Sequence, residues 1–129
     1  MSSALAPLLV TTSLVIGPTA GARERLIAAH LAPDLPGAPA CVAVLLEGLP
    51  DGTSIIFPSP SVLIERIAPG CLCCTGNLVL RVTLNRLLRR RPERLYIALA
   101  VTAHLDQLRS WLLQPPYDQL LELTPDLRT

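Results

Sequence analysis

The chain has 129 residues, the length of one ordinary domain with a single core. Half of its residues are apolar but only 3% are aromatic, and this aliphatic majority is typical of strands buried between helices. The formal net charge of +1 gives no strong field to attract nucleic acid or anionic lipid, so we expect neither a nucleic-acid partner nor a membrane partner.

The amino-terminal apolar run from Ala4 to Ile16 lacks the form of a secretion signal. No cationic residue precedes it, and Thr11, Thr12 and Ser13 interrupt it. It is also too short to span a bilayer. We therefore expect a cytoplasmic protein, in which thiols stay reduced and clustered cysteines indicate metal or redox chemistry rather than disulfides.

The first half of the chain predicts two buried strands joined through a helix. Residues 8–16 are rich in β-branched side chains and end at Gly17, which predicts a first strand and a turn. Apolar residues on one face predict a short helix over 23–31. A proline-rich connector at 32–40 leads to a second buried strand over 41–47.

The second half continues the alternation of strands and helices. Two short apolar runs, 54–57 and 62–67, are separated by prolines and are predicted as edge or hairpin strands. Leucines at helical spacing predict the best helix of the chain over 77–91. A third buried strand over 95–101 and a further helix over 105–112 follow.

This order of elements predicts one domain over residues 1–129. Strands alternating with helices indicate an α/β fold of three layers with a mostly parallel sheet. Residues 114–129 are expected to form a loose tail, with at most a helical turn or two within 117–129.

A basic run from Arg86 to Arg94 closes the predicted helix over 77–91. Such a run can serve nucleic acid or an acidic partner, but no aromatic residues for base stacking are interleaved with it. Cations at the carboxyl terminus of a helix are favourable in themselves. We therefore expect a solvated helix end.

Three of the four cysteines, Cys71, Cys73 and Cys74, lie in the segment Gly-Cys-Leu-Cys-Cys-Thr-Gly of residues 70–76. Thiolates are soft ligands that favour Zn(II) or Cu(I), and a fourth ligand normally completes a structural zinc site. Adjacent cysteines cannot converge from a regular strand, so an irregular turn at a helix start is the expected carrier. The dipole of that helix would lower the thiol pKa values.

The fourth ligand stays open between Cys41, Glu47, His30, His104 and water. An open position suits a site that takes up and releases metal. Two alternatives to metal binding remain, namely that the clustered cysteines are small buried apolar residues, or that they perform thiol redox chemistry. Cys41, alone in an apolar strand, fits the first alternative.

Residues 17–24 lie where a phosphate loop would lie, between the first strand and the first helix. In the pattern G-x-x-x-x-G-K-[ST], backbone amides wrap the phosphates, Lys reaches the β/γ-phosphates and the hydroxyl holds Mg²⁺. Here Ala22, Arg23 and Glu24 replace the second Gly, the Lys and the Ser/Thr, and the chain contains no lysine. Gly17, Gly21 and Arg23 remain as candidate phosphate contacts, without the groups that hydrolysis needs.

The chain resembles the CobW-type P-loop GTPase family. The resemblance is carried by residues 8–27, by the run 42–48 and above all by Gly-Cys-Leu-Cys-Cys-Thr at 70–75, where that family has G-C-[IL]-C-C-T. It extends from about residue 8 to about residue 112. It implies a P-loop NTPase-like α/β fold, GTP-driven handling of metals or metallocofactors, and zinc, cobalt or nickel near the cysteines.

Carried over by position, the resemblance assigns the metal motif to Cys71, Cys73 and Cys74. It makes Glu47 the candidate for the acidic residue after the second strand. The family's E-[ST]-[ST]-G after the third strand is replaced here by residues 98–101, Ala-Leu-Ala-Val. No N-K-x-D segment for guanine recognition occurs in the sequence, so the resemblance implies part of a GTPase domain.

The sequence thus predicts a metal-binding accessory or metallochaperone-like protein with a degenerate GTPase fold. Zinc or another transition metal is the expected ligand, GTP and Mg²⁺ are not expected to bind, and a metalloprotein client or an oligomeric partner is implied. One alternative is a weak GTP-binding protein or GTPase of metal or cobalamin-cofactor handling, in which Arg23 replaces Lys. Arg substitutes poorly for that compact charge. The other alternative is a non-catalytic interaction module that pairs with a fuller partner.

Overall fold

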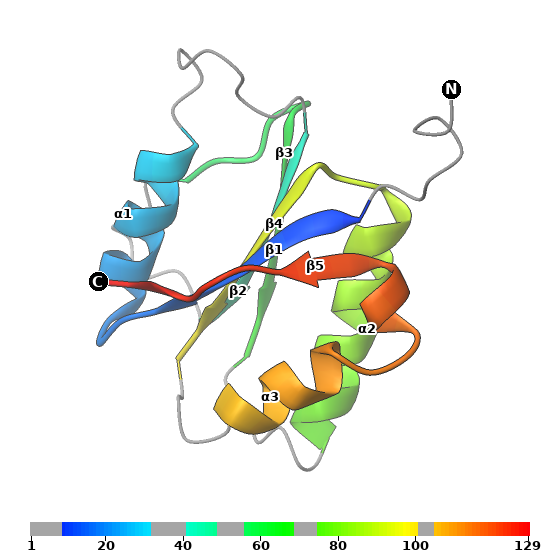
Figure 1. Cartoon of the computed structure of the whole chain (residues 1–129). Helices are drawn as coiled ribbons and strands as arrows, with labels where there is room; N and C mark the ends of the chain where they lie inside the picture. Colours follow the sequence, from blue (N-terminus) through cyan, green and yellow to red (C-terminus); the bar gives the residue numbers. More distant parts are fainter. Residues whose placement is uncertain (1–8, 32–40, 49–55, 69–74, 101–104) are drawn as a thin grey trace.

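The computed structural model describes residues 9–31, 41–48, 56–68, 75–100 and 105–129. Within them one sheet has the strand order β3-β2-β4-β1-β5, with β6 also beside β1 (Figure 1). Every pairing between these strands is parallel, which confirms the α/β fold with a mostly parallel sheet. The strands are β1 (Val10–Ile16), β2 (Val42–Glu47), β3 (Val62–Ile67), β4 (Arg94–Leu99), β5 (Leu121–Leu123) and β6 (Leu127–Arg128).

Helices cover both faces of the sheet, which makes the three expected layers. They are α1 (Ala20–His30), α2 (Thr75–Arg89), α3 (Leu105–Leu112) and the single 3₁₀ turn η2 (Tyr117–Gln119). Figure 1 shows α1 on one face and α2 with α3 on the other. None of the helices in the described part of the chain is long and apolar enough to cross a membrane.

The apolar strands are explained by this double cover. All six residues of β2 are buried, and successive side chains of a strand point to opposite faces. Val44 packs in the cluster that contains Ile27 of α1, whereas Leu45 packs in the cluster that contains Leu84 of α2. A strand with helices on both sides therefore reads as one continuous apolar run.

Three predicted elements differ from the structure in bounds, type or pairing. The first helix begins at Ala20, earlier than residue 23, because Thr19 caps its amino terminus. Ile56 and Phe57, the described part of the run 54–57, form no strand, and the Phe57 side chain is 71% exposed. The run 62–67 is the edge strand β3, paired in parallel with β2 rather than in a hairpin.

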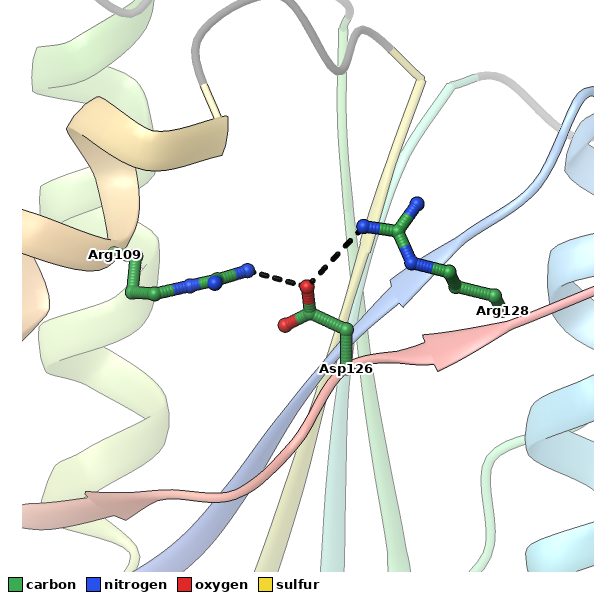
Figure 2. Close-up of polar contacts among 3 residues, drawn as sticks. All are labelled: Arg109, Asp126 and Arg128. Carbon is green, nitrogen blue, oxygen red and sulfur yellow. Dashed lines mark hydrogen bonds and ion pairs between the residues drawn. The ribbon is translucent and has the colours of Figure 1, made fainter.

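The carboxyl-terminal segment is fixed along β1, so the expectation of a loose tail was wrong. β5 and β6 both pair with β1, and the Thr124 amide between them donates to the Thr12 carbonyl at 2.8 Å. Asp126 accepts from Arg109 and lies 3.6 Å from the Arg128 guanidinium (Figure 2). Its side chain is only 11% exposed, so this triad anchors the segment to α3.

The protein is expected to lose stability at alkaline pH because of Tyr117. Its buried ring lies 4.7 Å from that of Trp111, and its hydroxyl donates to Asn85 Oδ1 at 2.8 Å. Burial raises the pKa of Tyr117, against the opposing charge of Arg81 and the hydrogen bond of Asn85. The stabilisation is therefore full below the unfolded-state pKa of about 10 and is lost as pH rises through the folded value.

Urea unfolding across this pH range measures that loss. The Tyr117→Phe variant is expected to be less stable at neutral pH, because Asn85 loses its donor, but to lose less stability between neutral and alkaline pH. An equally steep alkaline decline in both proteins would exclude Tyr117 as the titrating group.

Candidate functional site

The strand order places a topological switch point at the carboxyl ends of β1 and β4. After β1 the chain passes through α1 to β2, on one side, whereas after β4 it passes through α3 to β5, on the other. Adjacent parallel strands whose connections diverge leave a crevice at their carboxyl ends, where ligands bind in open α/β sheets. The candidate phosphate loop lies at this point of the fold.

The loop between β1 and α1 consists only of residues 17–19. The Thr19 side chain accepts a hydrogen bond from the Ala22 amide at 3.0 Å, so an amide that could face a phosphate is already capped. Gly21 and Arg23 lie within α1. The expected place of Gly21 in the loop was therefore wrong, since the helix begins before it.

The Arg23 side chain packs against the loop of residues 17–19. Its side chain is 4% exposed, and its Nη1 donates to the Gly17 carbonyl at 2.8 Å. Burial lowers the pKa of Arg23, while the carboxylates of Glu47 and Glu24 raise it in opposition. The guanidinium thus folds back onto the loop's own backbone rather than leaving its donors for a bound anion.

Arg23, Arg66, Glu24 and Glu47 line one recess at the carboxyl edge of the sheet, called here the charged recess. Glu24 Oε1 accepts from Arg66 Nη2 at 3.1 Å, and Glu47 Oε1 accepts from the Ala100 amide at 2.8 Å. Both glutamates are buried. Two cations and two anions balance, so the recess offers phosphate no net positive charge.

Glycine is required beside this recess at one position. Gly48 has a φ of +127°, a backbone conformation that other residues rarely adopt. It follows Glu47 directly, and its amide donates to the Ile67 carbonyl at 2.9 Å. The turn that it allows ends β2 immediately after the buried carboxylate.

The predicted metal ligands Cys71, Cys73 and Cys74 lie outside the described residues, so that site stays a prediction. The chain leaves β3 at the carboxyl edge of the sheet, where Ile67 is paired with Glu47. The cysteine segment therefore follows an element that ends beside the charged recess. Among the described residues, no group of three or more His, Cys, Asp or Glu could hold a metal ion.

The candidate fourth ligands lie at different ends of the fold. Cys41, a half-buried free thiol, precedes β2 and is about 20 Å along that strand from Glu47. His30 is exposed near the end of α1, with Nδ1 2.9 Å from the Leu26 carbonyl. His104 lies outside the described residues. Of those described, Glu47 alone is at the edge where β3 ends.

Sequence reasoning missed Arg66 as a member of the charged recess. Its partner Glu24 is 42 residues away in the chain, on the helix that follows β1. In the sheet, β2 and β4 lie between β1 and the strand β3 that carries Arg66. An available signal was the pair of ionised residues, Glu65 and Arg66, in a strand whose other residues are apolar, because a charge that becomes buried needs a partner. The partner itself could not be read from the spacing.

Comparison with known proteins gives one partial similarity. No protein-family model and no solved structure matches the chain. The chain is 33% identical over 73 residues to the zinc chaperone YeiR of Escherichia coli (strain K12). The match covers 56% of this chain and 22% of YeiR, so it spans about a fifth of that relative's length. The match supports the statement that this chain is a CobW-like relative.

Proposed function

We propose that the chain binds zinc or another transition-metal ion through Cys71, Cys73 and Cys74 and holds or delivers it as a metallochaperone-like accessory protein. The observation that carries the proposal is the similarity to a zinc chaperone in a chain that places three cysteines within four positions. The metal is the cargo of this activity rather than a resident cofactor.

The chemistry of the donor set suits transfer of a metal ion. Three thiolates bind a soft ion strongly, and a tetrahedral ion with three protein ligands keeps one position for an incoming ligand. Thiols must lose their protons to bind metal, so acid favours release. Glu47 is the described fourth-ligand candidate at this edge of the sheet, but a weaker ligand than the three cysteines, because its carboxylate already accepts from the Ala100 amide and faces Arg23.

Three features support a scaffold that works without a nucleotide. Thr19 caps the Ala22 amide at the start of α1, and Arg23 donates to the Gly17 carbonyl. The charged recess is neutral overall. In a nucleotide site, the backbone amide, the cationic side chain and the positive charge would all be directed at phosphate. Here each of them is satisfied within the protein.

Calorimetric titration with GTP is therefore expected to detect no binding tighter than about 1 mM, with or without Mg²⁺. The reason is that the Ala22 amide, the Arg23 guanidinium and the two carboxylates of the charged recess already have hydrogen-bond partners within the protein. A phosphate-release assay under the same conditions is expected to match the protein-free control. Micromolar affinity together with turnover would replace this part of the proposal with the weak GTPase.

Metal content tests the central claim. Protein purified without chelator, or loaded with zinc and then desalted, is expected to carry about one zinc ion per chain by elemental analysis. Substitution with cobalt(II) is expected to produce thiolate-to-metal charge-transfer absorption. A chain that stays metal-free after loading would overturn the proposal.

A further inference from the structure

Helix α2 carries an apolar surface that points away from the sheet. Its buried face is made of leucines such as Leu80 and Leu84, which are at most 1% exposed. On the opposite side Leu78, Val79 and Val82 are 63%, 49% and 50% exposed. Because residues three or four apart are neighbours on a helix, these three side chains form one patch over its first turns.

The same row of the helix becomes basic in its second half. Arg86 and Arg89 continue the spacing of Leu78 and Val82, and both are exposed. Arg86 makes one exposed ion pair with Glu65 at 3.4 Å. Arg89 makes no ion pair with any residue in the described part of the chain. Aliphatic and cationic halves thus succeed each other along about 17 Å of helix.

We propose that this α2 face, formed by Leu78, Val79, Val82, Arg86 and Arg89, binds an acidic amphipathic helix of a partner protein. Aliphatic side chains of the partner cover the first half, and its carboxylates pair with the two guanidinium groups. An apolar anchor beside a complementary charged rim is the arrangement by which helices are recognised in grooves and on faces. The inference does not require that the chain bind metal.

The distribution of charge selects this partner over a second copy of the chain. If two α2 faces met in parallel, Arg86 and Arg89 would oppose their own equivalents. If they met antiparallel, the guanidinium groups would lie on the aliphatic half of the other copy, where α2 offers no carboxylate. A partner with carboxylates has neither defect.

The same face suits a membrane less well. Only three aliphatic side chains are available, and no aromatic residue accompanies them on this row. The other side of α2 is fixed in the core, so the helix cannot turn more apolar surface towards lipid. Peptide recognition needs only the row that is already exposed.

A fluorescein-labelled synthetic peptide tests the inference on the full chain. The peptide is an alanine-rich helix with leucines four residues apart, followed by two turns that carry glutamates. Fluorescence anisotropy is expected to show saturable binding that weakens as salt rises. A matched peptide with glutamine for glutamate is expected to bind about tenfold more weakly. Absence of binding by the acidic peptide would overturn the proposal.

Two pairs of variants locate the site. Leu78→Ser with Val82→Ser, and separately Arg86→Glu with Arg89→Glu, are each expected to weaken peptide binding about tenfold. Leu113→Ser is the apolar control, since Leu113 is 59% exposed in the turn after α3, and Arg25→Glu on α1 is the charge control. Equal weakening by the controls would overturn the assignment to α2.

Two further measurements test whether a second copy of the chain or a membrane occupies the α2 face instead. Light scattering would contradict the proposal if it showed a dimer that the Leu78→Ser/Val82→Ser variant abolishes. Co-sedimentation with phosphatidylserine vesicles would contradict it if the same variant abolished that binding. Zinc content is expected to be the same in these variants as in the parent chain, which keeps this test separate from the test of metal binding.

Discussion

Replacement of Arg23 by alanine is expected to lower the free energy of unfolding by about 3 kcal/mol, a large part of a typical domain's stability. The variant loses the hydrogen bond to the Gly17 carbonyl and the packing of a side chain that is 4% exposed. It also leaves the buried carboxylates of Glu24 and Glu47 with Arg66 as the one remaining cation of the charged recess. A buried charge without its counter-ion is costly.

Urea unfolding measures this loss, with Arg25→Ala as the matched control. Arg25 lies on the same helix but is exposed, so its replacement is expected to change stability by no more than about 0.5 kcal/mol. The double variant Arg23→Met/Glu47→Gln, which removes one charge of each sign, is expected to recover part of the loss. Equal effects of the two alanine substitutions would show that the charged recess contributes no special stability.

Replacement of Cys71, Cys73 and Cys74 together by serine is expected to abolish zinc binding. A serine hydroxyl has nearly the size of the thiol but does not ionise near neutral pH, so all three soft anionic ligands are lost. Cys41→Ser is expected to keep the full zinc content. Cys41 precedes the amino end of β2, whereas the cysteine segment follows the carboxyl end of the neighbouring parallel strand β3. Elemental analysis after zinc loading measures both variants.

The thermal stability of the same proteins, measured as Tm with and without zinc, provides a second test of metal binding. A ligand that binds only the folded chain stabilises it in proportion to the logarithm of its concentration over Kd. Added zinc is therefore expected to raise the Tm of the parent chain and of Cys41→Ser, but not that of the triple variant. Equal metal content in the parent chain and the triple variant would end the metal hypothesis. A lower zinc content in Glu47→Gln would identify Glu47 as a ligand.

Much of the fold could be predicted because the central elements carry strong patterns. The helix over 105–112 has the predicted bounds, and the strand over 41–47 differs from β2 by a single residue. In contrast β5 and β6 have three and two residues, too few for any periodicity to appear. They are held by pairing with β1, more than a hundred residues earlier in the chain. Such short strands exist only because the long strand is already in place.

The candidate site was only partly predictable. The pattern of a phosphate loop drew attention to Gly17 and Arg23 as candidate phosphate contacts, and the structure joins these two residues by a hydrogen bond. It also obscured Thr19, an ordinary helix cap that begins α1 sooner. The role of Arg66 depended on the strand order, which no local pattern encodes. The cysteine cluster is the converse case, because it was found from the sequence alone and its metal site stays a prediction.

The position of Thr129 bears on how this protein is handled. Its amide donates to the Ile16 carbonyl at 3.0 Å, and a Cβ added to Gly17 would lie 2.6 Å from its Oγ1. Whatever is attached after Thr129 therefore leaves the molecule beside the β1–α1 loop. An affinity tag placed there, above all a histidine tag, would bring its own metal-binding imidazoles to the edge of the sheet under test. Tags for the zinc and GTP measurements belong at the amino terminus, with cleavage before assay.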